Sequence, residues 1–215
     1  MKTTTADEII SRFQYGQPVF LTIDEELMIL SEIDHDRDYV NNGSSRVVYG
    51  WRDKFVVKVA MAEGGQNQNQ TEKDFYCDFH HHGIFAPLYA YGRMINIMLR
   101  LQDCTYYDLY DVEEEDPIWQ TIELADELTE YDGGDNGQIG YNEEDSCWQL
   151  YDYGYSNNFE REEIVDDVQY WMDYINPIDH AKECISWAQY YTKEEMNDLC
   201  RDIRRRKHEE EEDCD

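Results

Sequence analysis

Residues 41–72, NNGSSRVVYGWRDKFVVKVAMAEGGQNQNQTE, decide how the first half of this chain folds. After a turn at residues 41–43 come two segments rich in β-branched and aromatic residues, SRVVYGW and KFVVKVA. The polar residues 52–54 separate them, so the pattern predicts a β-hairpin with these residues at its tip.

The second strand of this hairpin carries a lysine in an apolar setting. Because side chains alternate along a strand, Val56, Lys58 and Ala60 share one face. A buried charge requires a partner, so we expect an acidic group nearby. The alternative is a packing unit of the βαβ type in which Lys58 reaches the surface.

A helical pattern that begins at about Gln66 supplies the candidate partner. Glu72 lies on the same helical face as Phe75, Tyr76 and Phe79, with spacings of three, four and seven residues. Glu72 is therefore expected to point with the apolar stripe of the helix toward the sheet that holds Lys58.

Flanking segments complete the expected architecture. Residues 6–15 and 22–33 read as amphipathic helices, the second with a capping box at Thr22 and Glu25. The segments PLYAYG and INIMLRL read as strands that enlarge the hairpin to a sheet of four or five strands. A helix is expected from Ile118 to Tyr131, and a helical, acidic tail from 160 to 215.

A second informative stretch is YDGGDNGQIGYNEEDSCWQLYDYGYS, residues 131–156. A glycine-rich polar loop leads into two short strands, and the second strand ends in Asp152-Tyr153-Gly154. A carboxylate that follows a strand end can hold Mg²⁺. The plainer alternative is a β-hairpin with a polar approach loop.

The net charge of the chain limits the kinds of molecule that it can bind. With 18 Lys and Arg against 49 Asp and Glu, the 215-residue chain has a formal net charge of −31. Such a chain avoids nucleic acid and anionic membranes and is attracted to basic partners. The alternative is a well-solvated surface or a salt-adapted proteome. Six scattered cysteines, without a CxxC pair, signal peptide or transmembrane run, favour a cytoplasmic location.

Taken together, these stretches resemble the protein-kinase-like superfamily, in particular the compact, divergent kinase-like proteins of tailed phages. GSSRVVY resembles the nucleotide-covering hairpin, VVKVA the lysine strand and QNQTE the glutamate helix. TEYDGGDNGQIGY resembles the catalytic loop, and LYDYG the metal-binding element. The resemblance covers roughly residues 38–156.

The resemblance implies an α+β fold with a small antiparallel β-sheet N-lobe, one key helix and a reduced, mainly helical C-lobe. The implied divisions are an N-terminal helical extension (1–37), the N-lobe (38–102) and an acidic C-lobe (103–215). The implied location is the cytoplasm of an infected bacterial host.

The resemblance also implies roles for individual residues. Lys58 would hold the phosphates of ATP, Glu72 would orient Lys58, Asp152 would bind Mg²⁺ and Asp132 would be the catalytic base. The implied nucleotide-binding residues are Gly43, Ser44, Lys58, Glu72, Asn136 and Gln138.

Three departures indicate catalytic degeneration. The phosphate loop keeps one glycine where kinases usually have three. Asn136 and Gln138 lie four and six residues after Asp132, where kinases place asparagine five residues after the aspartate. The residues after Gly154 contain no APE-like segment.

Two functions follow as hypotheses. The first is a degenerate kinase-fold protein whose acidic surface mimics DNA or RNA and inhibits a basic host nucleic-acid-binding or defence protein. The second is an active ATP- and Mg²⁺-dependent kinase that phosphorylates host proteins. The acidic residues expected to face the partner are Glu113, Glu114, Glu115, Asp116, Glu162, Glu163, Asp166 and Asp167.

Overall fold

The computed structural model describes residues 4–43, 45–61, 63–103, 117–129, 139–153, 172, 175–188, 190, 192, 195, 198–203 and 205–206. Over these residues the chain is an α+β protein with one large and one small β-sheet. The elements in chain order are α1 (Ala6–Ile10), β1 (Val19–Phe20), α2 (Ile23–Glu32), α3 (His35–Asp38), β2 (Tyr39–Asn42), β3 (Arg46–Trp51), β4 (Phe55–Ala60), α4 (Glu63–Phe79), the 3-10 turn η1 (His80–His82), β5 (Leu88–Tyr91), β6 (Ile95–Leu99), β7 (Gln102–Asp103), α6 (Pro117–Thr129), β8 (Ile139–Asn142), β9 (Cys147–Leu150) and α8 (Pro177–Trp187).

The predicted hairpin lies in the larger sheet, whose strand order is β1-β5-β6-β4-β3-β2. Its strands β3 and β4 pair antiparallel, with Val48 opposite Lys58 and Trp51 opposite Phe55. At the tip, Arg52 and Asp53 have φ angles of 53° and 57°, the left-handed conformation that tight hairpin turns use. The tip predicted at residues 52–54 is thereby confirmed.

Residues 38–102 contribute five antiparallel strands, β2–β6, as expected for the N-lobe, but the larger sheet has six strands and is mixed, one more than the four or five expected. The additional strand is β1, which pairs parallel with β5 through Val19 and Ala90. It comes from residues 1–37, which were expected to be only helical. Helix α1 ends at Ile10 instead of Tyr15, and the chain then turns at Gly16, whose φ is 74°. The capping box of Thr22 and Glu25 at the start of α2 is confirmed.

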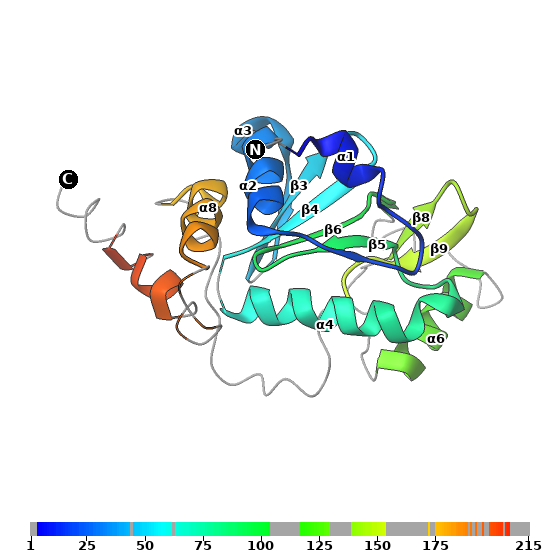
Figure 1. Cartoon of the computed structure of the whole chain (residues 1–215). Helices are drawn as coiled ribbons and strands as arrows, with labels where there is room; N and C mark the ends of the chain where they lie inside the picture. Colours follow the sequence, from blue (N-terminus) through cyan, green and yellow to red (C-terminus); the bar gives the residue numbers. More distant parts are fainter. Residues whose placement is uncertain are drawn as a thin grey trace.

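One face of the large sheet is apolar and is covered by helices from both ends of the chain. In Figure 1, α1 and α2 lie above the sheet and α8 lies beside α2. The core on this face includes Ile29 and Leu30 of α2, Val57 of β4, and Ile178 and Ile185 of α8. The tail helix α8 therefore belongs to the core of the sheet. The boundaries proposed at 37/38 and 102/103 stay predictions.

The opposite face of the sheet is covered by the long helix α4 (Figure 1). Close packing at its first turn depends on Gly65, because a Cβ there would lie 2.4 Å from the carbonyl oxygen of Ser45. At its end, η1 terminates at Gly83, which has a φ of 75°. Tyr76 of α4 is fully buried in a second apolar cluster. The first turn of α4 therefore packs closely on the sheet at Gly65, and its last turn is buried through Tyr76.

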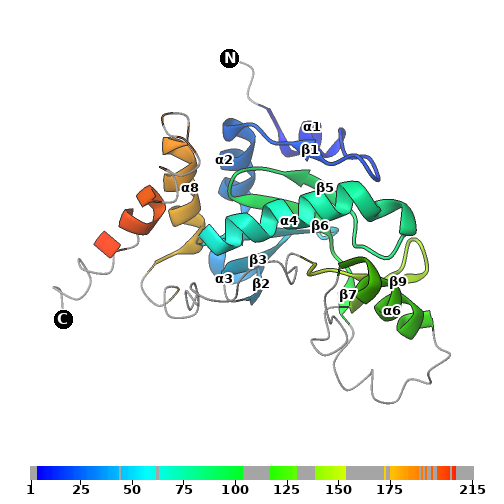
Figure 2. The same ribbon diagram turned by 90° about the horizontal axis from the view of Figure 1, so that it is seen from below.

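The smaller sheet, in the order β7-β8-β9, lies with α6 near the C-terminal end of α4 (Figure 2). The hairpin β8–β9 agrees with the predicted pair of strands, except that β9 ends at Leu150, before Asp152 and Tyr153, which were expected to end the strand. The backbone of Leu150 donates to Ile84 at 2.8 Å and accepts from Ala86 at 2.9 Å. These two bonds tie the end of β9 to the segment before β5, and so bring the residues after β9 to the sheet face under α4.

Candidate functional site: an ion cluster between the sheet and helix α4

Lys58 lies at the centre of the face that α4 covers. It is 4% exposed and stands between Val48 of β3 and Asn96 of β6 in the sheet register. Its Nζ donates to a carboxylate oxygen of Glu72 and, at 2.6 Å, to the carbonyl oxygen of Tyr151. The ammonium group is thus held from the helix on one side and from the residues after β9 on the other.

Glu72 is the buried acidic partner that the helical pattern predicted. The residue is fully buried on α4. Its Oε1 binds Lys58, and its Oε2 lies 2.8 Å from Nη1 of Arg46 and 3.1 Å from Nδ2 of Asn96. The predicted ion pair between Lys58 and Glu72 is therefore present, and it excludes the alternative in which Lys58 reaches the surface.

Arg46, at the start of β3, is a site residue that the sequence analysis did not single out. It is 4% exposed. Its Nη1 contacts Glu72 and donates to Oδ1 of Asn69 at 3.2 Å, and its Nη2 donates to Oδ1 of Asp152 at 2.5 Å. One guanidinium group therefore bridges the two carboxylates.

Asp152 completes the arrangement from the segment after β9. Its Oδ1 accepts from Arg46 and lies 3.5 Å from Nζ of Lys58. Burial opposes ionisation of Asp152, but the charges of Lys58 and Arg46 outweigh that effect and lower its pKa. The carboxylate is thus ionised at neutral pH.

The next residue, Tyr153, anchors Asp152 in place. It is fully buried, donates its hydroxyl to the carbonyl oxygen of Ala86 at 3.0 Å, and packs edge-on against Phe85 with ring centroids 4.9 Å apart. Burial raises the pKa of the Tyr153 hydroxyl well above its usual range, so the group stays protonated and remains a donor. The position of Asp152 is therefore fixed by the apolar cluster beneath it.

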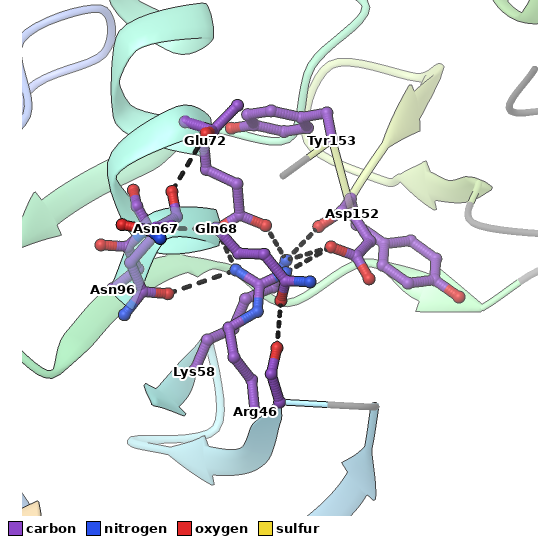
Figure 3. A network of polar contacts seen from close by, with 12 residues as sticks. Arg46, Lys58, Asn67, Gln68, Glu72, Asn96, Asp152 and Tyr153 are labelled. Atoms are coloured by element: carbon purple, nitrogen blue, oxygen red, sulfur yellow. Dashed lines mark hydrogen bonds and ion pairs between the residues drawn. The ribbon is translucent and has the colours of Figure 1, made fainter. Parts of the chain in front are cut away.

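We call Arg46, Lys58, Glu72 and Asp152 the ion cluster. Figure 3 shows the four side chains converging from the sheet, from α4 and from the segment after β9. Two positive and two negative charges balance within it. The side chains of Arg46, Lys58 and Glu72 are at most 5% exposed, whereas that of Asp152 is 27% exposed. Asp152 is therefore the member of the cluster that solvent reaches most easily.

Amide side chains surround the cluster. Asn96 donates to the carbonyl oxygen of Asn69 at 2.9 Å, and Asn69 donates to that of Met94 at 3.2 Å. Within the described part of the chain, Oδ1 of Asn96 is buried without a hydrogen-bond partner. The amides link α4 to β6 and stiffen the frame around Glu72.

The other predicted site residues have different outcomes. Gly43 is an exposed turn residue between β2 and β3, and its N–H donates to the carbonyl oxygen of Arg46 at 2.9 Å. A Cβ at Gly43 would meet nothing within 4 Å, so packing does not require glycine there. The predicted residues that lie outside the described part of the chain are Ser44, Asp132, Asn136, Gln138, Glu113, Glu114, Glu115, Asp116, Glu162, Glu163, Asp166 and Asp167.

The described residues around Asp152 do not fit a magnesium ion. Mg²⁺ requires oxygen ligands, but the Oδ1 of Asp152 is already bound by Arg46 and lies beside Lys58. Two fixed cations at this carboxylate oppose a divalent ion. In the portion of the chain that is described, no group of three or more His, Cys, Asp or Glu side chains is arranged to hold a metal.

A cavity of about 560 Å³ lies elsewhere, between α6 and the smaller sheet. Thr121 and Leu124 of α6 and Tyr141 and Trp148 of β8 and β9 are among the residues that line it. No member of the ion cluster does. The cavity and the ion cluster are therefore separate features.

Comparison of the chain with protein-family models, curated proteins and solved structures found no match. None of the helices in the described ranges is long and apolar enough to cross a membrane.

Proposed function

We propose that this chain is a degenerate protein-kinase-like protein that binds the phosphates of a nucleotide at Lys58. The observation that carries the proposal is the ion pair between Lys58 of β4 and Glu72 of α4, with Asp152 next to both. In protein kinases, a strand lysine pairs with a helix glutamate to hold the ATP phosphates, and the Asp of the Asp-Phe-Gly motif lies beside them.

The order of elements along the chain supports this proposal. A hairpin, a lysine strand, a glutamate helix, two further strands and a hairpin followed by Asp152-Tyr153 succeed one another as in the resemblance. Tyr153 packs in the apolar cluster as the phenylalanine of the kinase motif would. Glu72 follows Lys58 by 14 residues, and Asp152 follows Glu72 by 80 residues, so local sequence alone does not bring the three together.

The N–H donors of Lys58 already have partners within the ion cluster and at Tyr151. Lys58 has three N–H donors, and Glu72, Tyr151 and Asp152 lie within reach of them. A phosphate group would therefore have to compete with Asp152 for Lys58. The catalytic base that the resemblance implies, Asp132, lies outside the described residues.

Nucleotide binding tests the proposal directly. ATP should raise the unfolding midpoint of the wild-type protein, because a ligand that binds the folded state stabilises it. Lys58→Ala should abolish this shift. The matched control is Lys54→Ala, at the hairpin tip, where Lys54 pairs with Glu144 and both are exposed. If ATP leaves the wild-type midpoint unchanged, the ion cluster serves only to support the fold and the proposal fails.

A phosphotransfer assay separates the degenerate protein from an active kinase. With the purified protein, labelled ATP and a general acceptor such as casein, we expect no transfer above background. Transfer that disappears in Asp152→Ala would instead establish the active ATP-dependent kinase.

A second proposed function rests on a different observation, the net charge of −31. In this proposal the chain binds the basic groove of a host nucleic-acid-binding or defence protein and inhibits it, in the cytoplasm of a phage-infected bacterium. Carboxylates placed like phosphates would use the electrostatic attraction that dominates nucleic-acid binding.

Salt and competition test the second proposal. Binding of a captured host protein should weaken steeply as NaCl rises, since charge pairs are screened over about 8 Å at physiological ionic strength. DNA or RNA should displace the chain, and charge reversal at Glu162, Glu163, Asp166 and Asp167 should weaken binding. Lys58→Ala should leave it unchanged. Binding that persists at high salt, or alongside the nucleic acid, would refute mimicry.

A further inference from the structure

Arg46 distinguishes this ion cluster from a kinase site, in which a metal ion binds the aspartate beside the lysine–glutamate pair. Arg46 lies at the start of β3, just after the turn between β2 and β3, in the segment that resembles the nucleotide-covering hairpin of kinases. Its guanidinium group contacts Oε2 of Glu72 at 2.8 Å and Oδ1 of Asp152 at 2.5 Å. A positive charge thus already stands at the carboxylate that would otherwise hold a metal ion.

The charge balance of the cluster leads to the same conclusion. Without Arg46, one lysine would face two carboxylates, and the remaining negative charge would attract a divalent cation. With Arg46 the charges cancel, so in the site without nucleotide a divalent cation would add uncompensated positive charge beside Lys58. Arginine also keeps its charge at every pH that proteins tolerate and presents a planar group that binds phosphate oxygens in pairs.

Solvent exposure shows how a ligand would reach the arginine. Asp152 is the member of the cluster with substantial exposure, at 27%, and its Oδ1 contacts Nη2 of the buried Arg46 at 2.5 Å. An anionic phosphate can therefore compete with the carboxylate of Asp152 for Arg46 and Lys58, both of which come from the same sheet face.

We propose that Arg46 takes the place of the metal ion, so that this site binds nucleotide phosphates without a divalent cation. The inference rests on the proposed nucleotide-binding function and specifies it further. Arg46 and Lys58 together bind the phosphate oxygens, and Glu72 holds both cations in position.

The test is isothermal titration of the full chain with ATP, once in EDTA and once in excess Mg²⁺. We expect the two dissociation constants to agree within about threefold, since threefold is less than 1 kcal/mol. Adenosine, which lacks phosphates, should bind at least tenfold more weakly than ATP in EDTA. Inorganic tripolyphosphate should bind in EDTA if phosphates alone are recognised.

Substitutions at Arg46 test whether this residue is responsible for ATP binding without a metal ion. Arg46→Gln should weaken ATP binding in EDTA at least tenfold, and Mg²⁺ should restore part of it. Arg46→Lys keeps the charge and should retain most of the binding in EDTA. The matched control is Arg12→Gln, which removes an arginine paired with Glu25 at 2.7 Å on the opposite face of the sheet. It should leave both dissociation constants unchanged.

The outcomes are distinguishable. ATP binding by the wild type only in Mg²⁺ would overturn the role of Arg46 and leave the proposed function standing. Unchanged binding of Arg46→Gln in EDTA would also overturn it. No ATP binding under either condition would overturn both proposals. The wild-type comparison needs no variant, so it can overturn the proposal even if Arg46→Gln does not fold, and Arg46→Lys then tests the role of the arginine.

Discussion

At the scale of single residues, the ion cluster is a balanced set of buried charges with little tolerance for removal of one member. Glu72 is central, because both of its oxygens are bonded to cations. Removing one partner of a buried ion pair is far more destabilising than the net contribution of the pair itself, since the other charge stays buried without compensation.

Glu72→Gln should therefore lower the free energy of unfolding by about 3–5 kcal/mol. The glutamine keeps the size of the side chain but leaves Lys58 and Arg46 facing Asp152 alone. Urea denaturation at neutral pH measures the difference. Glu144→Gln, which breaks the exposed pair with Lys54, should change stability little. Equal effects of the two substitutions would contradict the buried cluster.

A second buried carboxylate, Glu26 of α2, lies on the other face of the sheet. It is fully buried, and its Oε1 accepts from the backbone of Met94 at 3.0 Å and of Ile95 at 3.3 Å. Its Oε2 has no hydrogen-bond partner among the described residues. Burial raises the pKa of Glu26 to about 7, although these backbone donors act to lower it.

This pKa predicts a stability that falls as pH rises. The pKa of Glu26 in the folded state exceeds the ordinary glutamate value of 4.5. The stability that protonated Glu26 contributes is therefore fully present below pH 4.5 and is lost as the pH rises to about 7. One pKa unit corresponds to about 1.4 kcal/mol, so the loss is on the order of 3 kcal/mol.

Glu26→Gln should remove that loss, because glutamine does not ionise. Denaturation at pH 5 and at pH 8 measures the effect, and the substitution should become more favourable, relative to the wild type, at pH 8. All other titratable groups are present in both proteins and cancel in the comparison. The same pH dependence in both proteins would show that Glu26 is not the titrating group.

The sequence was sufficient to predict Lys58 and Glu72 as partners, because strand and helix periodicities each assign a face. Arg46 was not predicted as a site residue, although the same periodicity, combined with the strand register, places it there. A hairpin tip centred on Asp53 places Arg46 opposite Ala60, and period two then puts it on the face of Lys58. An arginine at the start of an apolar strand was the available signal. Assigning Arg46 to the face of Lys58 requires the register of the two strands in addition to their positions in the sequence.

At the scale of elements, the placement of α4 determines whether Glu72 reaches the sheet. Two adjacent glycines in its first turn have different surroundings. A Cβ at Gly65 would lie 2.4 Å from the carbonyl oxygen of Ser45, whereas the nearest atom to a Cβ at Gly64 is 3.6 Å away. Only Gly65 is therefore required by packing.

Gly64→Ala should stabilise the protein by up to about 1 kcal/mol, the difference in helix propensity between the two residues. Gly65→Ala has the same propensity gain, but the added methyl group meets backbone and forces α4 away from the sheet. It should be destabilising overall. Urea denaturation of the two variants checks this, and stabilisation by both would mean that α4 does not pack as described.

Two elements escaped the sequence analysis for physical reasons. Strand β1 has two residues, too few for an alternating pattern, and its pairing with β5 is nonlocal. Helix α8 was recognised as helical, but its contact with α2 and β4 joins residues more than 100 positions apart in the chain. Amphipathic patterns show which face of a helix is apolar, and they do not identify the surface that covers it.

At the scale of the whole molecule, the excess of acidic residues acts against the compact state. A formal net charge of −31 on 215 residues produces repulsion throughout the fold, whatever partner the surface serves. The ion cluster is neutral in sum and buried, so salt screens it little. Salt should therefore weaken the repulsion between exposed charges more than it weakens the interactions within the cluster.

Raising NaCl from 0.01 M to 0.1 M shortens the screening length from about 30 Å to about 10 Å. The unfolding midpoint, followed by circular dichroism at pH 7, should rise over this range. Reversing Glu162, Glu163, Asp166 and Asp167 to lysine changes the formal net charge from −31 to −23 and should reduce the rise. A midpoint that falls with salt would show that attractive surface pairs outweigh repulsion. Repulsion among the excess acidic groups would then not be what limits the stability of the fold.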